Sequence, residues 1–126
     1  MKIRYYQTPG GRSPVEDFLL GLPEATRLEV ADAIVLLESG QALEMPLSRY
    51  LAGIRPGLHE LRFRDRAGQV RVIYYLKKGD AIYLVHAFRK KTQTIPRREL
   101  DIIEAPCSKL QGIFDPQGSI FILIAR

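Results

Sequence analysis

Hydrophobic and polar positions alternate most clearly in three runs near the middle of the chain: Leu58 to Arg64, Gln69 to Lys77 and Ala81 to Phe88. Alternation with a period of two is typical of a strand with one buried and one exposed face. The connections between the runs are short and contain glycine, so we expect an antiparallel meander of two hairpins. A fourth run, Lys2 to Gln7, is rich in strand-forming residues and ends at Pro-Gly-Gly, which predicts a short N-terminal strand.

Two helices are predicted between that strand and the meander. Residues 13–16, Ser-Pro-Val-Glu, have the pattern of a capping box, and the helix they begin should run to about Leu20. Pro23 opens a second helix, which Gly40 ends. The positions that recur at helical spacing in the second helix are Leu28, Ala31, Ile34, Val35 and Glu38. We expect the two helices to form an amphipathic hairpin that covers the sheet.

The remaining segments complete a single domain over residues 1–126. Gln41 to Pro56 is expected to be a loop, and Pro96 to begin a short C-terminal helix that ends at residues 105–106, Ala-Pro. Residues 105–126 form an atypical tail, in which Ser119 to Ile124 has the composition of a strand. The fold class is therefore α/β in the α+β sense, with an antiparallel sheet of about four strands, two N-terminal helices on one face and a short C-terminal helix.

Composition excludes several classes of protein. The single cysteine, Cys107, excludes an internal disulfide, and the two histidines have no Cys or His neighbour at ligand spacing. We therefore expect no metal and no other cofactor. The N-terminus lacks the apolar core of a signal peptide, and no apolar run approaches the roughly 20 residues of a membrane span. These features favour a cytoplasmic protein with no membrane partner.

Positive charge is concentrated in one part of the chain. Residues 55–98 contain twelve Lys or Arg and three acids, a local charge of +9, whereas the whole chain carries +5. Interspersed charges would serve solubility, but a concentrated positive charge attracts a polyanion. A nucleic-acid or phosphate partner follows from this distribution.

Alternation sorts the charged residues of the meander onto one face of the sheet. Glu60, Arg62 and Arg64 fall together, as does Arg71 with Ile73 and Tyr75 in the next run. Glu60 could simply pair with Arg62 or Arg71 as a half-buried ion pair. Alternatively Arg62 and Arg71, joined by Lys90 and Lys91, bind the phosphate of a substrate strand, for which the planar guanidinium is well suited. The candidate catalytic set is Arg62, Arg71, Lys90, Lys91 and Glu60.

If the reaction is RNA cleavage, the 2′-hydroxyl attacks the adjacent phosphorus and requires a base. His59 and His86 have suitable pKa values but are expected to face the core. Glu60, or a lysine whose pKa is lowered by like-charged neighbours, could serve instead. Tyr74, Tyr75 and Tyr83 could stack on bases or simply pack. The residues expected to guide RNA toward the site are Arg64, Arg66, Lys77, Lys78, Arg89 and Tyr75.

Several motifs together resemble a known family. GLHELR at residues 57–62, VRVIYY at 70–75 and AFRKKT at 87–92, with MPL at 45–47, resemble the phage-related HigB branch of the RelE/ParE toxin superfamily. The resemblance covers roughly residues 2–104. It implies a RelE-like fold and a toxin of a type II toxin–antitoxin system that cuts messenger RNA on the ribosome without a metal. Its partner would be a helix-turn-helix antitoxin, and the matching basic site positions are Arg62, Arg71, Lys90 and Lys91.

The chain departs from this family at its C-terminal end. Many relatives place a tyrosine or histidine of that region near the scissile phosphate, whereas the tail, residues 105–126, contains neither. The tail could be an added strand or could mediate a homodimer. A non-catalytic binding module therefore stays open as an alternative, either a ParE-like gyrase inhibitor or an inactive relative that binds only its antitoxin.

Overall fold

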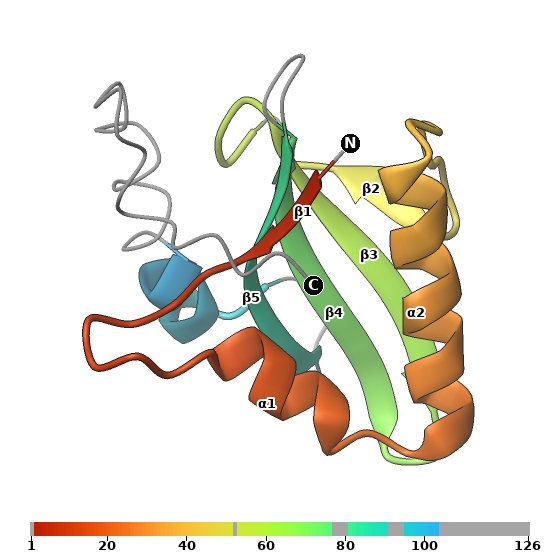
Figure 1. Cartoon of the computed structure of the whole chain (residues 1–126), viewed down its shortest axis with the longest axis horizontal. Coiled ribbons are helices and arrows are strands. Elements are labelled where there is room, and N and C mark those ends of the chain that lie inside the picture. Colours follow the sequence, from red (N-terminus) through yellow and green to blue (C-terminus); the bar gives the residue numbers. More distant parts are fainter. Residues whose placement is uncertain (1, 52, 77–80, 91–94, 104–126) are drawn as a thin grey trace.

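A computed structural model describes residues 2–51, 53–76, 81–90 and 95–103, and its centre is one five-stranded sheet (Figure 1). The strands are β1 (Lys2–Tyr5), β2 (Ser48–Tyr50), β3 (Leu58–Asp65), β4 (Gly68–Leu76) and β5 (Ala81–Lys90). The helices are α1 (Pro14–Leu20), α2 (Glu24–Glu38) and a further helical segment at residues 97–103. No helix in this described part of the chain is long and apolar enough to cross a membrane.

The predicted meander is confirmed, because β3, β4 and β5 pair in order and antiparallel. Two details of the predicted sheet were wrong. It has five strands in the order β1-β5-β4-β3-β2, because residues 48–50 form a strand inside the segment expected to be a loop. It is mixed, because β1 lies parallel to β5. The strand β2 was missed because three residues are too few to show alternation. The parallel orientation of β1 was missed because it depends on the long connection through both helices, which no local pattern describes.

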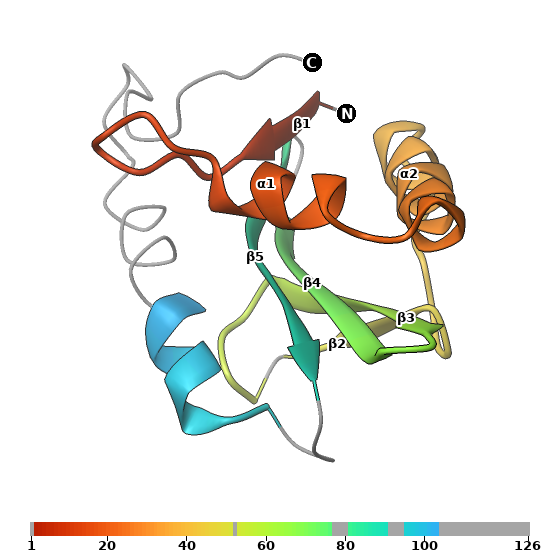
Figure 2. The same cartoon turned by 90° about the horizontal axis from the view of Figure 1, so that it is seen from below.

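The helices lie on both faces of the sheet (Figure 2). α1 and α2 pack on one face, where Val15, Leu19 and Val30 join a cluster of sheet residues. The segment 97–103 lies on the other face, where Ile103 joins a second cluster. We call this second face the arginine face, since Glu60, Arg62 and Arg71 belong to it. The general α+β class that the sequence predicted is therefore found.

One detail at the start of α1 differs from the prediction. Ser13 precedes α1, but its side chain makes no capping hydrogen bond, so the capping box is not formed. The backbone of Ser13 has ψ near 86°, and its hydroxyl has no hydrogen-bond partner in the described chain. Proline at the start of the helix and Gly21 at its end fit the prediction. The expected strand in the tail, residues 119–124, lies outside the described residues.

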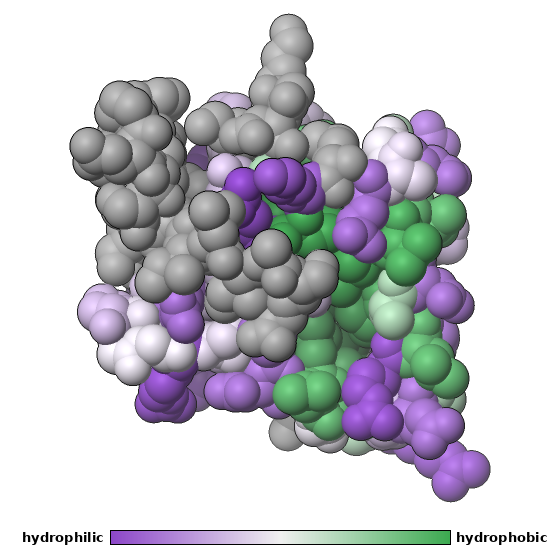
Figure 3. Space-filling view, viewed as in Figure 1, coloured by the Kyte–Doolittle hydropathy of each residue, from purple (hydrophilic) through white to green (hydrophobic). Residues whose placement is uncertain are grey.

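The buried face of α2 is not the one that spacing indicated, although Ile34 of the predicted set packs partly buried against the core. The side chains of Thr26, Val30, Ala33 and Leu37 face the sheet, whereas Leu28 and Val35 are each 59% exposed. α2 has two apolar stripes, and spacing alone does not decide which of them packs inward. Hydrophobic residues consequently gather along α2 and over the neighbouring strands on the outer surface (Figure 3).

An irregularity in β5 moves His86 to the arginine face. Leu84 pairs with Tyr74 and His86 pairs with Ile73, so Val85 is an extra residue in the ladder. Such a bulge places two successive side chains on one face. The expectation that His86 faces the helices was therefore wrong. When strict alternation is counted across a bulge, every residue after the bulge is assigned to the opposite face of the sheet.

Candidate functional site

The strand register brings basic residues from four strands together on the arginine face. Arg49 of β2 lies opposite Glu60 of β3. One row further along, Arg62 lies opposite Arg71. In the next row Gln69 lies between Arg64 and Lys90. Because paired residues share a face, the side chains of this grid project to one side of the sheet.

Glu60 is the centre of this grid. Its side chain is only 1% exposed, and one carboxylate oxygen lies 3.6 Å from Nε of both Arg62 and Arg71. Neither carboxylate oxygen has a hydrogen-bond partner within the described part of the chain, and the same holds for Nε of Arg71. A buried carboxylate is tolerated when cations compensate it. Glu60 is therefore the internal counter-ion of an otherwise cationic surface.

Arg71 is held in place by its own strand. Its guanidinium donates a hydrogen bond to the carbonyl of Val70 at 3.2 Å and another to the side-chain oxygen of Gln69. Burial lowers the pKa of Arg71, while the charge of Glu60 partly opposes that effect. Arginine remains a cation despite such a shift, because the delocalised guanidinium is the most basic of the side-chain groups.

Arg62 is the more accessible of the two arginines, with 27% of its side chain exposed. Its guanidinium donates to the sulfur of Met45 at 3.5 Å, and its backbone N–H donates to the carbonyl of Leu47 at 2.8 Å. The segment before β2 therefore borders Arg62 on the outside. A ligand can reach this guanidinium without displacing the Glu60–Arg71 pair.

Lys90 completes the group that we call the Glu60 cluster: Glu60, Arg62, Arg71 and Lys90. Lys90 is 3% exposed, and burial is the main reason that its pKa lies below the ordinary value. Glu60 opposes this shift, while the nearby arginines add to it. A lysine that releases its proton more easily is suited to accept one from a hydroxyl.

Two pockets open onto the cluster. One, of about 320 Å³, has Glu60 and Lys90 among its lining residues, with Arg49 and Tyr50 from β2 and Leu100 from the segment 97–103. The other, of about 630 Å³, contains Arg62, Arg64 and Arg71 and reaches Glu29 and Asp32 of α2. The buried charges are thus accessible from the surface, as a binding site requires.

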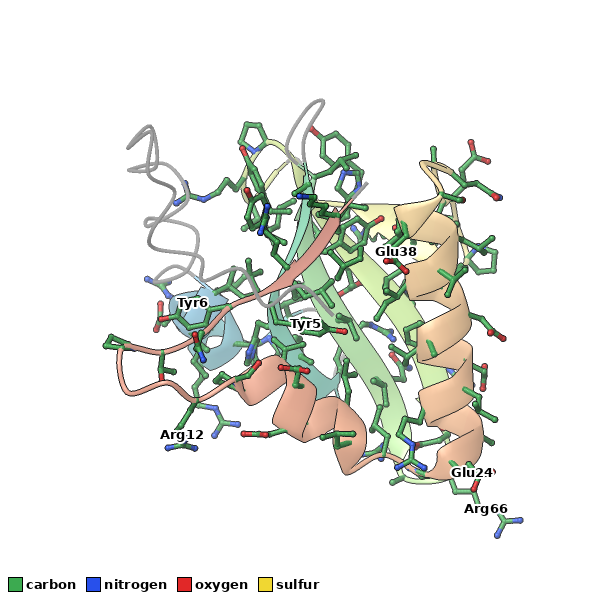
Figure 4. All side chains as sticks on the ribbon, viewed as in Figure 1. Tyr5, Tyr6, Arg12, Glu24, Glu38 and Arg66 are labelled. Atoms are coloured by element: carbon green, nitrogen blue, oxygen red, sulfur yellow. The ribbon has the colours of Figure 1, made fainter. Side chains whose placement is uncertain are left out.

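The other predicted basic residues lie elsewhere or are not described. Arg89 is on the helix side and donates two hydrogen bonds to Asp65, at 2.6 and 2.8 Å, so it stabilises the hairpin. Arg66 projects from the turn between β3 and β4 (Figure 4). Tyr75 packs against the second hydrophobic cluster. Lys77, Lys78 and Lys91 lie outside the described residues.

Both histidines have structural neighbours. The ring of His59 lies between those of Tyr50 and Tyr74, and burial lowers its pKa. Nε2 of His86 lies 2.8 Å from a carboxylate oxygen of Glu99, which joins β5 to the segment 97–103. Neither histidine lines the two pockets at the Glu60 cluster. Glu60 and Lys90 are therefore the candidates for the general base that would accept the proton of a hydroxyl.

Arg49 is the residue that the sequence reasoning missed. It was assigned to a loop, yet it lies directly across from Glu60 and lines the smaller pocket. The three residues Ser48-Arg49-Tyr50 contain only one strand-favouring residue, Tyr50, and are too few to show alternation, so no local signal marked this strand.

Comparison with known proteins identifies the family. Residues 17–107, well over half of the chain, match the family described as Phage derived protein Gp49-like (DUF891). The chain belongs to the Gp49-like family. This family is of the RelE/HigB-like toxin type, so the coarser part of the resemblance drawn from the sequence is confirmed. No curated protein shows significant similarity to this Gp49-like chain. The match includes all four residues of the Glu60 cluster.

Proposed function

We propose that this Gp49-like protein is a HigB-like toxin of a type II toxin–antitoxin system and cleaves messenger RNA on the ribosome. The observation that supports the proposal most strongly is the Glu60 cluster, in which Arg62 and Arg71 flank one buried carboxylate, with Lys90 nearby, beneath two open pockets. A structural ion pair requires only one cation for each carboxylate, whereas Glu60 has two arginines beside it. The additional positive charge can bind a second anion, and the phosphodiester of an RNA strand is such an anion.

Arg62 and Arg71 bind the scissile phosphate and neutralise the charge that develops on it. Arg71 is fixed by Gln69 and by its own backbone, so its guanidinium is already oriented before RNA arrives. Arg62 is accessible enough to contact the RNA first. Glu60 holds both guanidinium groups in place, and we assign it a positioning role.

Lys90 takes the proton of the 2′-hydroxyl, because burial favours its neutral form. The hydroxyl oxygen then forms a bond to phosphorus while the bond from phosphorus to the 5′-oxygen breaks. The 5′-oxygen takes a proton from water. The products are a 2′,3′-cyclic phosphate and a 5′-hydroxyl, so the reaction requires no metal, cofactor or redox partner. Lys91 belongs to the same proposal as an RNA-backbone contact.

The ribosome positions the message in this proposal. The described site has an anion-binding cluster and one candidate base but no paired general acid. This suits an enzyme whose substrate is held in the reactive geometry by another particle, here the ribosome. The toxin would act in the cytoplasm. Its control would come from a helix-turn-helix antitoxin, as expected for a toxin of this type.

Induction in growing bacteria tests the proposal. We expect growth arrest with translation blocked and with new 5′ ends inside translated messages, whereas untranslated RNA stays intact. Arrest with DNA damage and intact messages would instead identify a gyrase inhibitor. Absence of arrest from a folded, expressed protein would identify an inactive antitoxin-binding relative.

The decisive variant is Arg62→Ala, with Arg12→Ala as the matched control. Arg62 is partly exposed, and its removal leaves Glu60 paired with Arg71, so the fold should survive. Arg12 is an exposed arginine on the segment before α1 (Figure 4), and it lines neither of the two pockets at the Glu60 cluster. Toxicity should be lost in the first variant and retained in the second. Equal toxicity of both variants would contradict the phosphate role of Arg62.

A further inference from the structure

Arg49 is a cation of the arginine face that does not belong to the Glu60 cluster. Strand β2 pairs antiparallel with β3, and Arg49 lies directly opposite Glu60 in that register. Its side chain therefore projects from the same face of the sheet as that of Glu60. Arg49 is exposed, and within the described part of the chain it forms no ion pair with an acid. Its guanidinium is thus available to an anion from outside the protein.

Arg49 lies beside the phosphate site that Arg62 and Arg71 form. Arg62 follows Glu60 by two residues on β3, so Arg49 and Arg62 are diagonal neighbours across the two strands. Diagonal neighbours in an antiparallel pair are about 7–8 Å apart. Successive phosphates of an extended single strand are separated by a similar distance. Two arginines at this spacing can therefore bind two consecutive phosphates of one RNA strand.

The two pockets divide the basic residues of this face into two groups. Arg62 and Arg71 line the larger pocket, whereas Arg49 lines the smaller one together with Glu60 and Lys90. Burial is the main cause of the lowered pKa of Lys90, and the charge of Arg49 adds to it, so these two groups lie close enough to interact. A strand with one phosphate on Arg62 and the next on Arg49 passes from the larger pocket into the smaller one.

The location of Lys90 indicates the direction of that strand. In the proposed reaction Lys90 accepts the proton of the 2′-hydroxyl, which belongs to the nucleotide on the 5′ side of the scissile phosphate. Lys90 lines the smaller pocket, so this nucleotide occupies it. Leu51, Ile54 and Leu100 line the same pocket and offer apolar surface to the ribose and base. The next phosphate in the 5′ direction then lies at Arg49.

We propose that Arg49 binds a second phosphate of the RNA, the one immediately 5′ of the scissile phosphate, so that the strand runs 5′ to 3′ from Arg49 toward Arg62. The inference rests on the proposed function and adds to it a substrate contact and a strand polarity. Arg49 touches neither the reacting phosphorus nor the attacking hydroxyl, so its role is to hold the RNA. A contact to phosphate does not depend on the identity of the base.

Binding of short RNAs tests the second phosphate without any cleavage. One trinucleotide has two phosphates, and the other has a neutral methylphosphonate in place of the 5′ phosphate; both carry 2′-O-methyl groups, which prevent cutting. We expect the unmodified protein to bind the first about fivefold more tightly in titrations at low salt. For Arg49→Ala this ratio should fall to about twofold, which the choice of either phosphate for a single site supplies by itself.

Two further variants are the controls of the binding test. Arg12→Ala should keep the full ratio between the two trinucleotides, because Arg12 lines neither pocket. Arg49→Lys should keep most of the ratio, because it retains the positive charge. Arg49 is exposed, so all three variants should have the thermal midpoint of the unmodified protein. A ratio that Arg49→Ala leaves unchanged would overturn the proposal.

Cutting of a ribosome-bound message tests the direction of the strand, because the cut marks the scissile phosphate. At limiting toxin, Arg49→Ala should cut an unmodified synthetic message about fivefold more slowly than the unmodified protein. A methylphosphonate one step 5′ of the cut should make the two proteins equal, whereas one placed a step 3′ of the cut should leave the difference intact. A difference that disappears only with the 3′ methylphosphonate would overturn the polarity.

The outcomes separate this inference from the proposed function. If Arg49→Ala keeps the full binding ratio while Arg62→Ala fails to cut, the second phosphate site is refuted and the proposed function stands. If the unmodified protein cuts no message, the proposed function and the assignment of the 5′ side are refuted together. The trinucleotide comparison then still decides whether Arg49 binds a second phosphate.

Discussion

Replacing Glu60 by glutamine removes the one negative charge at the centre of the Glu60 cluster. Each pair at 3.6 Å has a gross attraction of about 4–5 kcal/mol at an effective dielectric constant of 20, and desolvation of the ions offsets much of it. Removing one partner of a buried pair leaves the other charge uncompensated and typically costs about 3–5 kcal/mol. Glutamine keeps an oxygen that can accept hydrogen bonds, so we expect a loss of about 3 kcal/mol in the free energy of unfolding.

Thermal and urea unfolding measure this loss. About 3 kcal/mol corresponds to a decrease of roughly 10 °C in the unfolding midpoint of a domain of this size. Adding Arg71→Met to Glu60→Gln removes the uncompensated buried cation, so the double variant should recover most of the stability. Arg62→Ala alone should cost under about 1 kcal/mol, because that pair is partly exposed.

The same substitution should act in the opposite direction on RNA binding. With Glu60 neutral, the phosphate no longer competes with an internal carboxylate, so Glu60→Gln should bind single-stranded RNA more tightly and be stabilised by it. Unchanged stability of Glu60→Gln, together with unchanged RNA affinity, would refute the view that Glu60 is the counter-ion of this site.

Four further substitutions test other parts of the structure. Leu37→Ala should lower the free energy of unfolding by about 3 kcal/mol and Leu28→Ala by under about 0.5 kcal/mol in urea titrations, because only Leu37 is buried; equal effects would contradict the register of α2. Burial raises the pKa of Glu99, but its hydrogen bonds outweigh this and hold the pKa below the ordinary value, so Glu99→Gln should destabilise at pH 7. That difference should shrink as the pH falls below the ordinary pKa of a glutamate and vanish below the lowered pKa of Glu99; a constant difference would contradict the pairing. Gly57→Ala should lower the thermal midpoint, because φ is +86° and an added Cβ would lie 2.9 Å from the ring of Tyr75; an unchanged midpoint would contradict this strain.

The sequence was sufficient for the parts of the fold that depend on local pattern. Alternation in residues 58–88 predicted three strands, their hairpin order and the common face of Glu60, Arg62 and Arg71. Proline and glycine predicted where α1 and α2 begin and end to within a residue or two. Such features follow from backbone geometry and from the spacing at which side chains return to the same face. Both are set by the local sequence of each segment, without contacts to other segments.

Other features depend on contacts between distant segments. The choice between two apolar stripes of α2 is made by the sheet beneath it, and the bulge at Val85 is seen only from its pairing with β4. Arg49 was missed for the same reason, because three residues become a strand only when β3 pairs with them. The contact between His86 and Glu99 joins elements that no local pattern relates.

The central claim is that the Glu60 cluster binds and cleaves a phosphodiester of ribosome-bound message. The most direct test combines purified toxin with ribosomes carrying a defined messenger RNA and maps the new ends by primer extension. The account predicts cuts within the translated region that leave a 2′,3′-cyclic phosphate, retained by Arg12→Ala and abolished by Arg62→Ala. Intact message with the unmodified protein, or equal cutting by Arg62→Ala, would contradict it.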